Sequence, residues 1–154
     1  MAVTHVTLTD GLKTTIKTRQ HVYHADEPPQ DGGTDTAVSP MEMVLGALGS
    51  CIAITVKLYA QRKGWPLERV EVAVDEERFG GKDYADYEGD AKYIYEIRKN
   101  IRFYGPLDEK QIERLYDIAG KCPVHRMIDL PTFWKELELE TEAESEGTSE
   151  KQPE

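Results

Sequence analysis

The stretch SPMEMVLGALGSC, residues 39–51, decides how the chain folds. Its serine is a favourable helix N-cap, and Pro40 suits the first helical position because its fixed φ is already helical. Glu42 stands at the third helical position, where a carboxylate can bond back to the N-cap amide and complete a capping box. The sequence therefore predicts a helix that begins at Pro40.

This helix should continue to about Lys63 and end at Gly64, which suits a left-handed C-cap. Its middle, residues 43–56, is apolar or small on every side. A helix without a polar face is normally buried all round, but a small sheet covers only one side of it. We therefore expect a second copy of the chain to cover the rest. The small residues that would allow close approach are Gly46, Gly49, Ser50 and Ala53.

The rest of the chain predicts an α+β fold. Alternating or β-rich runs bounded by turn residues read as strands. These are a hairpin over residues 6–17 with a two-residue Asp10-Gly11 turn, an added strand over 22–26, and strands over 70–74, 93–104 and 132–140. Within residues 93–104, Lys99 interrupts an otherwise apolar face.

A second helix is predicted to begin after Asp108, with Gln111 completing its capping box. Its apolar positions follow helical spacing and lie on one face. They are Ile112, Leu115, Ala119 and Cys122. Cys122 should therefore close this helix and point inward, and Pro123 should end it before a short turn or helix over residues 123–129.

The 154-residue chain carries a formal net charge of −10. The acidic balance argues against a nucleic-acid partner. The first residues lack the basic start and apolar run of a signal peptide, and the uncharged segment 43–56 is too short to span a membrane. We therefore expect a cytoplasmic protein without nucleic-acid or membrane partners.

The C-terminal end differs in composition from the rest. Residues 141–154 hold five glutamates, one lysine and no large apolar side chain. Such a segment buries too little apolar surface to offset the entropy lost on ordering. We therefore expect one folded domain over residues 1–140, followed by a disordered acidic tail over residues 141–154.

Two cysteines, Cys51 and Cys122, stand 71 positions apart without a CxxC motif. Both fall on apolar helical faces, so two inward-pointing thiols could meet in a small core. Three interpretations stay open: inert buried thiols, a reversible redox pair, or zinc ligation together with His125. His21 and His24 fit ordinary strand-end residues better than metal ligands.

The order and spacing of these features resemble the OsmC/Ohr family. Residues 24–72 carry the Ser-Pro start of the long helix and, eleven positions after Pro40, Cys51. Residues 105–128 carry a second helix followed by CPVHR, residues 122–126. This arrangement looks most like an OsmC-like branch whose second cysteine lies in that motif.

The resemblance implies antiparallel sheets wrapped around central helices in an intertwined homodimer, with an active site at each subunit junction. It also implies thiol-dependent reduction of organic hydroperoxides. Cys51 corresponds to the peroxidatic cysteine, which becomes a sulfenic acid, and Cys122 to the resolving cysteine, which forms a Cys51–Cys122 disulfide. An external dithiol then reduces this disulfide, and no bound cofactor is implied. The alternative is a non-catalytic dimer that binds a small apolar or thiol-reactive ligand.

The family also uses an arginine and a glutamate beside the reactive thiol. The glutamate directly follows the proline in its better-known branches, whereas Met41 holds that place here and Glu42 comes one position later. One residue turns a helical side chain by about 100°, so Glu42 is either a cap only or a cap that also assists catalysis. Arg19, expected on the second strand, is the candidate arginine or else an exposed strand residue. Arg126 is a reserve candidate.

Overall fold

The structure, a computed structural model, describes residues 3–137. In chain order its elements are β1 (Thr4–Thr7), β2 (Thr14–Thr18), β3 (His21–Ala25), the 3₁₀ turn η1 (Pro29–Asp31), α1 (Pro40–Lys63), β4 (Arg69–Gly80), β5 (Tyr93–Tyr104), α2 (Glu109–Ala119) and α3 (Pro123–Asp129). The strands form a three-stranded sheet, β1-β2-β3, and a β4-β5 ribbon, both antiparallel. The predicted α+β fold is therefore confirmed.

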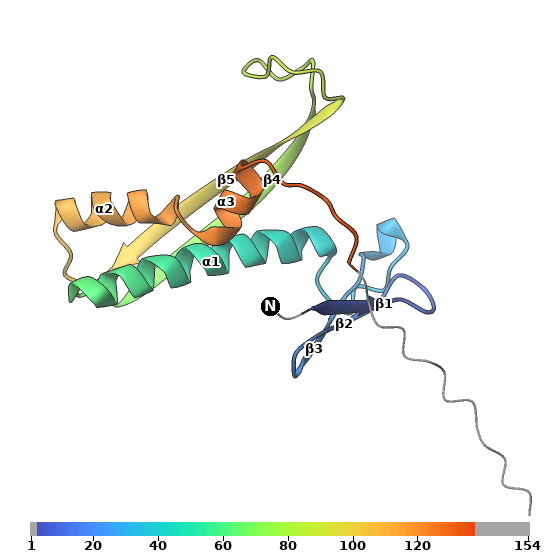
Figure 1. The fold of residues 1–154 in the computed structure, drawn as a ribbon, viewed down its shortest axis with the longest axis horizontal. Coiled ribbons are helices and arrows are strands. Elements are labelled where there is room, and N and C mark those ends of the chain that lie inside the picture. The colour runs from blue at the N-terminus through green and yellow to red at the C-terminus, as the bar shows by residue number, and fades with distance from the viewer. Residues whose placement is uncertain (1–2, 138–154) are drawn as a thin grey trace, which may run out of the picture.

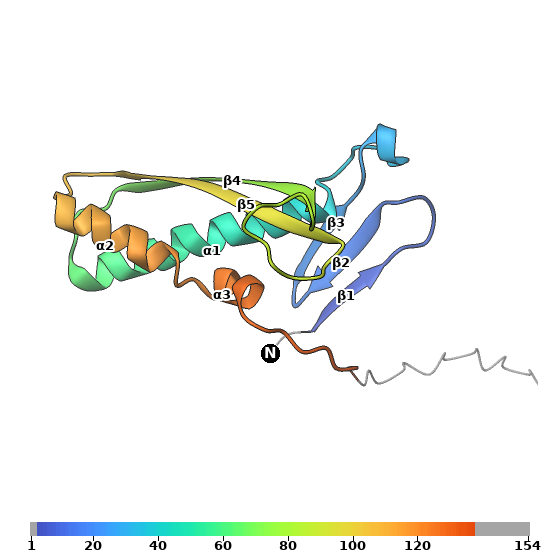
Figure 2. The same cartoon turned by 90° about the horizontal axis from the view of Figure 1, so that it is seen from above.

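The long helix α1 lies along the β4–β5 ribbon (Figure 1). Seen from above, α1, α2 and α3 all lie on one side of this ribbon (Figure 2). The three-stranded sheet lies near the N-terminal end of α1. The core of this part of the chain therefore forms between the ribbon and the helices.

The boundaries of α1 agree with the prediction. Ser39 Oγ accepts the Glu42 N–H at 3.2 Å, and the Ser39 N–H donates to Glu42 Oε2 at 2.7 Å, which completes the capping box. At the other end Gly64 adopts a left-handed φ of 65°. Both ends are therefore determined by contacts within a few residues of each terminus.

One row of α1 side chains enters the core. Its members, spaced four residues apart, are Leu48, Ile52, Val56 and Ala60. They form one cluster with buried residues from the ribbon and α2, including Ile101 and Leu115. This packing fixes the rotation of α1 about its axis.

The expectation that α1 is buried on every side is wrong for the single chain. Val44, Ile54 and Leu58 are 47%, 59% and 52% exposed, because the ribbon, α2 and α3 cover only part of the helix. By length and composition α1 could also cross a membrane, in contrast to the estimate from residues 43–56 alone. Core helices of globular proteins meet the same criteria, so the length and composition of α1 are weak evidence for a membrane-spanning helix.

The β4–β5 ribbon turns one row of side chains toward the helices. Its register pairs Val72 with Ile101 and Val74 with Lys99. Ile101 is buried and the two valines are half-buried, whereas Ala73 between them is exposed. Lys99 therefore belongs to the helix-facing row.

The N-terminal hairpin is confirmed, but its turn is longer than predicted. Thr7 pairs with Thr15, so the connection includes residues 8–13. This register centres on Gly11, which adopts a left-handed φ of 66° at little cost because it lacks a Cβ. A two-residue turn at Asp10 and Gly11 would need a register shifted by one residue.

The strands predicted over residues 22–26 and 93–104 correspond closely to β3 and β5. The strand predicted over residues 70–74 is part of a longer strand: β4 covers 12 residues. This extension pairs residue by residue with β5 as far as Gly80 and Tyr93.

The strand predicted over residues 132–140 is absent from its described part. Residues 131–137 form neither helix nor strand. Phe133 and Trp134 are 86% and 94% exposed, so the single chain offers this segment no core or neighbouring strand. Residues 138–154, which include the predicted acidic tail, lie outside the described residues.

A buried carboxylate organises the loop that leads into α1. Asp26 is 1% exposed and accepts hydrogen bonds from the hydroxyls of Thr34 at 2.5 Å and Thr36 at 3.0 Å. The backbone N–H groups of Glu27, Thr34 and Thr36 also donate to it. These donors, with Thr34 foremost, hold the pKa of Asp26 well below its usual range, although burial opposes them. Gly33 is required nearby, because a Cβ there would overlap the Glu27 carbonyl.

Asp26→Asn should lower the free energy of unfolding at neutral pH, because the hydroxyl and amide donors lose their anionic acceptor. The deficit should shrink as the pH falls below about 4, where the unfolded wild type begins to bind a proton that the folded state resists. Urea unfolding at pH 7 and pH 3 measures both effects. Asp10→Asn, in the exposed β1–β2 loop, is the matched control. A deficit of equal size at both pH values would contradict this role.

Candidate active site

Cys51 lies in the middle of α1. It is half-buried, packs against the core, and lies next to Ile52 and one turn after Leu48, both of which are buried. The cap at Ser39 sets where the helix begins, and the buried row sets its rotation. Together these two constraints bring the Cys51 thiol to the edge of the core.

Cys122 reaches the same core from an unexpected element. α2 ends at Ala119, and Cys122 is the N-cap of α3, with the extended backbone that a following Pro123 favours. Its side chain is 0% exposed, and its Sγ accepts the backbone N–H of His125 at 3.3 Å. The expectation that Cys122 closes the second helix is wrong, but its inward direction is confirmed.

The two thiols interact within this core. Burial raises the pKa of Cys122, and the neighbouring Cys51 raises it further. Backbone N–H groups of His125 and Val124 oppose this shift without cancelling it. Both cysteines are free. The structure therefore brings two reduced thiols together, and Cys122 is held in the protonated form.

A cavity of about 350 Å³ lies beside the elements that carry the thiols. Its lining comes from α1, β5 and α3, through Leu48, Tyr95, Ile97, Lys99, His125, Ile128 and Asp129. Leu48 lies one turn before Cys51, and His125 donates its backbone N–H to Cys122. Its walls combine the apolar side chains of Leu48, Ile97 and Ile128 with the polar groups of the other four residues, a mixture that can bind a small molecule.

Lys99 is the residue of this site that sequence reasoning missed. The structure places its Nζ 3.3 Å from Nδ1 of His125, at the cavity. The sequence shows only that a lysine interrupts an apolar strand row, and the structure leaves this lysine exposed. Only the fold, which brings α3 beside β5, supplies its partner His125.

The structure does not bring Glu42 or Arg19 to the thiols within one chain. Glu42 closes the cap, nine residues before Cys51, a rise of roughly 13 Å along the helix. Arg19 lies in the turn between β2 and β3 with a left-handed φ of 55°, not in the strand expected for it. Among residues 3–137 it forms no side-chain hydrogen bond or ion pair with either cysteine. The cap is confirmed, and a catalytic role for either residue stays a prediction.

The zinc alternative finds no ligand set in the described part of the chain, where no three His, Cys, Asp or Glu side chains gather. His21 and His24 lie in β3 with exposed side chains, as expected of ordinary strand residues. Arg126, the reserve arginine, is an exposed residue of α3.

A model of the OsmC family, described as OsmC-like protein, matches residues 33–138, more than half of the chain. The chain belongs to the OsmC-like family. No curated protein matches it significantly. The family match spans α1, the ribbon and both cysteines, while assignment to a branch with the CPVHR motif stays a prediction.

Solved structures share this OsmC-like fold at low sequence identity. An OsmC-like protein from Mycoplasma pneumoniae is 19% identical with a TM-score of 0.65, over 84% of this chain and 87% of that one. OsmC of Legionella pneumophila, an organic hydroperoxide resistance protein, is 15% identical with a TM-score of 0.61, over 83% and 88%. An organic hydroperoxide resistance protein of Elizabethkingia anophelis, with thiocyanate bound, is 13% identical with a TM-score of 0.55, over 78% and 88%.

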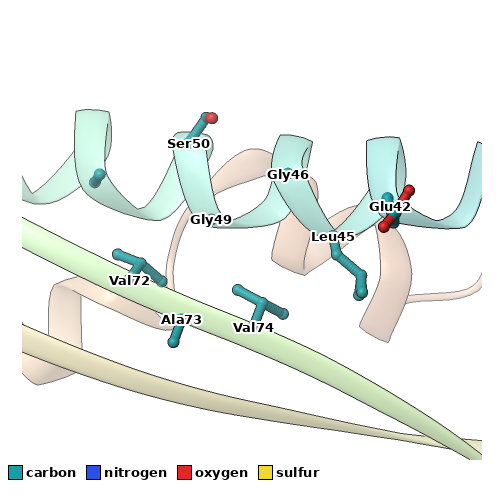
Figure 3. Close-up of a pocket in the computed structure, with 9 residues that line it drawn as sticks. Glu42, Leu45, Gly46, Gly49, Ser50, Val72, Ala73 and Val74 are labelled. Carbon is teal, nitrogen blue, oxygen red and sulfur yellow. The ribbon is translucent and has the colours of Figure 1, made fainter. Parts of the chain in front are cut away.

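The OsmC-like chain also has an open groove of about 620 Å³ between α1 and β4. Val72 and Val74 point from β4 toward α1, whereas Ser50 lies on the far side of the helix (Figure 3). Gly49 permits this close approach, because a Cβ there would lie 3.4 Å from Val74 Cγ2. Neither thiol lines either hollow, but the smaller cavity at β5 is lined by His125, whose backbone N–H contacts Cys122, so it is the better candidate for sulfur chemistry.

Two substitutions of Glu42 distinguish its role in the helix cap from a role in catalysis. Glu42→Gln keeps an oxygen that accepts the Ser39 N–H, so we expect its melting temperature and its thiol reaction with hydroperoxide to match the wild type. Glu42→Ala should melt about 2–4 °C lower, because the N-cap amide loses its acceptor. Scanning calorimetry and a single-turnover thiol assay measure the two effects. A rate loss above about tenfold in a normally stable Gln variant would contradict a role as cap only.

Proposed function

We propose that this OsmC-like protein is a cytoplasmic thiol peroxidase that reduces organic hydroperoxides. The observation that carries the proposal is that the half-buried Cys51 and the buried Cys122 lie together in one core as free cysteines, near a cavity with both apolar and polar walls. Two structural relatives named organic hydroperoxide resistance proteins support this direction at the level of the family.

The proposed reaction takes place in two steps at the thiols. The Cys51 thiolate attacks the outer oxygen of ROOH, the O–O bond breaks, and RO⁻ leaves and takes up a proton to become ROH. Cys51 is then a sulfenic acid. The Cys122 thiolate attacks its sulfur, hydroxide leaves and is protonated to water, and a Cys51–Cys122 disulfide forms. An external dithiol restores both thiols by exchange.

The assignment of the two roles rests on burial and protonation. Cys51 is half-buried, so an oxidant can reach it, whereas Cys122 is 0% exposed. The raised pKa of Cys122 keeps it a neutral thiol at rest, which suits a residue that waits for Cys51 to be oxidised. The apolar side chains at the cavity, Leu48, Ile97 and Ile128, favour an alkyl hydroperoxide over hydrogen peroxide.

We infer that the working protein is a homodimer. The exposed row of α1 contains Val44, Ile54 and Leu58, and burying each such side chain is worth about 1.5–3 kcal/mol. Gly46, where a Cβ would meet nothing within 4 Å, borders the open groove and would let a second backbone approach. A second copy of the chain is the occupant that fits, because a two-fold contact covers the same row in both copies.

One equivalent of cumene hydroperoxide should convert the wild type to a Cys51–Cys122 disulfide, detected by a non-reducing peptide map. Cys51→Ser should consume no peroxide. Cys122→Ser should consume one peroxide per chain and then stop, because the sulfenic acid formed on Cys51 then has no resolving thiol. Thiols that stay reduced in the wild type while the peroxide remains would reject the peroxidase and favour a non-catalytic binding protein. Unchanged turnover of Cys122→Ser with a dithiol would reject only its resolving role.

Ile54→Asp should convert a dimeric wild type to monomers, because it places one charge per subunit in the apolar contact. Ile54→Leu, which keeps an apolar side chain of equal size, is the matched control and should stay dimeric. Sedimentation equilibrium measures the mass, and flotation with phospholipid vesicles tests a membrane as the alternative cover. A monomeric wild type, or one that floats with vesicles, would contradict the dimer.

A further inference from the structure

Lys99 stands where the strand pattern calls for an apolar side chain. It lies in the helix-facing row of β5, directly opposite Val74 and two positions from the buried Ile101. Among the ion pairs between residues 3–137 none involves Lys99. Its ammonium group is instead 3.3 Å from Nδ1 of His125.

This contact determines which nitrogen of His125 carries the proton. An ammonium group donates hydrogen bonds and accepts none, so Nδ1 must be the acceptor and must be unprotonated. The ring proton of neutral His125 therefore lies on Nε2. The contact with Lys99 thus leaves Nε2 as the hydrogen-bond donor of the imidazole.

The pair borders the cavity and, through the backbone of His125, the buried thiol of Cys122. Lys99 and His125 both line the cavity, and the backbone N–H of His125 is bonded to Cys122 Sγ. Leu48, which lines the same cavity, precedes Cys51 by one helical turn. The other ionisable groups at the cavity are the carboxylate of Asp129 and the phenol of Tyr95. A molecule in this cavity would meet the cation-bound imidazole of the residue whose backbone contacts Cys122.

We propose that His125, positioned by Lys99, donates the proton that the leaving alkoxide requires when Cys51 cleaves a hydroperoxide. The inference rests on the proposed peroxidase function. As the O–O bond breaks, Nε2–H transfers its proton to RO⁻, and the Lys99 ammonium bonded to Nδ1 stabilises the negative charge left on the ring. Water then returns a proton to Nε2, because Nδ1 stays bonded to Lys99. His125 is then a catalytic residue, and Lys99 is a positioning residue that acts through it.

The need for this proton depends on the leaving group. An alkoxide resembles hydroxide, whose conjugate acid is a very weak acid, so it is a poor leaving group without a proton. A carboxylate, whose conjugate acid has a pKa of about 4, leaves without one. Alkyl hydroperoxides release the first kind of anion and peroxy acids the second. A proton donor therefore accelerates only the reaction with alkyl hydroperoxides.

Lys99→Met and His125→Gln should slow single-turnover oxidation of Cys51 by cumene hydroperoxide about 10²-fold, the lower end expected for a lost general acid. With peroxyacetic acid both variants should stay within about threefold of the wild type by the same reasoning. Lys99→Arg should recover much of the lost rate, because arginine also donates to Nδ1. Lys121→Met removes an exposed lysine next to Cys122 and is the matched control for charge alone. It should behave as wild type with both oxidants.

A wild-type measurement keeps the inference testable if a variant fails to fold. Nitrogen NMR of labelled wild type should find His125 protonated at Nε2 and not at Nδ1, and the cumene hydroperoxide rate should fall in D₂O while the peroxyacetic acid rate does not. Equal rate losses with both oxidants, or a proton on Nδ1, would overturn the donor role while leaving the peroxidase intact. A wild type that oxidises Cys51 with neither oxidant would overturn the proposed function and the donor role together.

Discussion

The rest of this structure depends on one row of side chains along α1. The row comprises Leu48, Ile52, Val56 and Ala60, and it packs between the β4–β5 ribbon and α2. Four-residue spacing defines a single line on a helix, so burying that line fixes the rotation of α1 about its axis. The same rotation turns Cys51 toward the core and leaves Ile54 and Leu58 facing outward.

The chemistry of the site follows from placing a few polar atoms in an apolar region. Burial keeps Cys122 protonated, and only two backbone N–H groups oppose that effect. Lys99 and His125 satisfy each other at the edge of the same region, 3.3 Å apart. His125 makes both contacts, one through its ring and one through its backbone to Cys122, so small displacements of α3 would change both the thiol and the imidazole.

A single chain leaves part of its apolar surface uncovered. Besides the outer row of α1, the side chains of Phe133 and Trp134 are almost fully exposed, and residues 131–137 pair with no strand. Large aromatic side chains normally contribute much of the burial in a core or interface. These two regions are therefore where the single chain departs most from the fold expected of the sequence, and both agree with the proposed dimer.

The sequence alone determined those features that depend on contacts between residues close together along the chain. Ser39, Glu42 and Gly64 define the ends of α1 through contacts spanning three or four residues, and Asp108 and Gln111 begin α2 in the same way. Strand alternation identified the helix-facing row of β5, and the order of the motifs indicated the family. These features could be predicted because local hydrogen bonds and periodicity do not require knowledge of the whole fold.

Only the tertiary structure decided which distant groups meet. Cys122 caps α3 because Pro123 extends the backbone after α2, and its contact with Cys51 joins residues 71 positions apart. Lys99 finds His125 across 26 positions, so its role is invisible in the strand pattern that contains it. Arg19 lies in a turn because the β2–β3 register ends the strands at Thr18 and His21. Such contacts depend on how whole elements pack, and no short stretch of sequence specifies that packing.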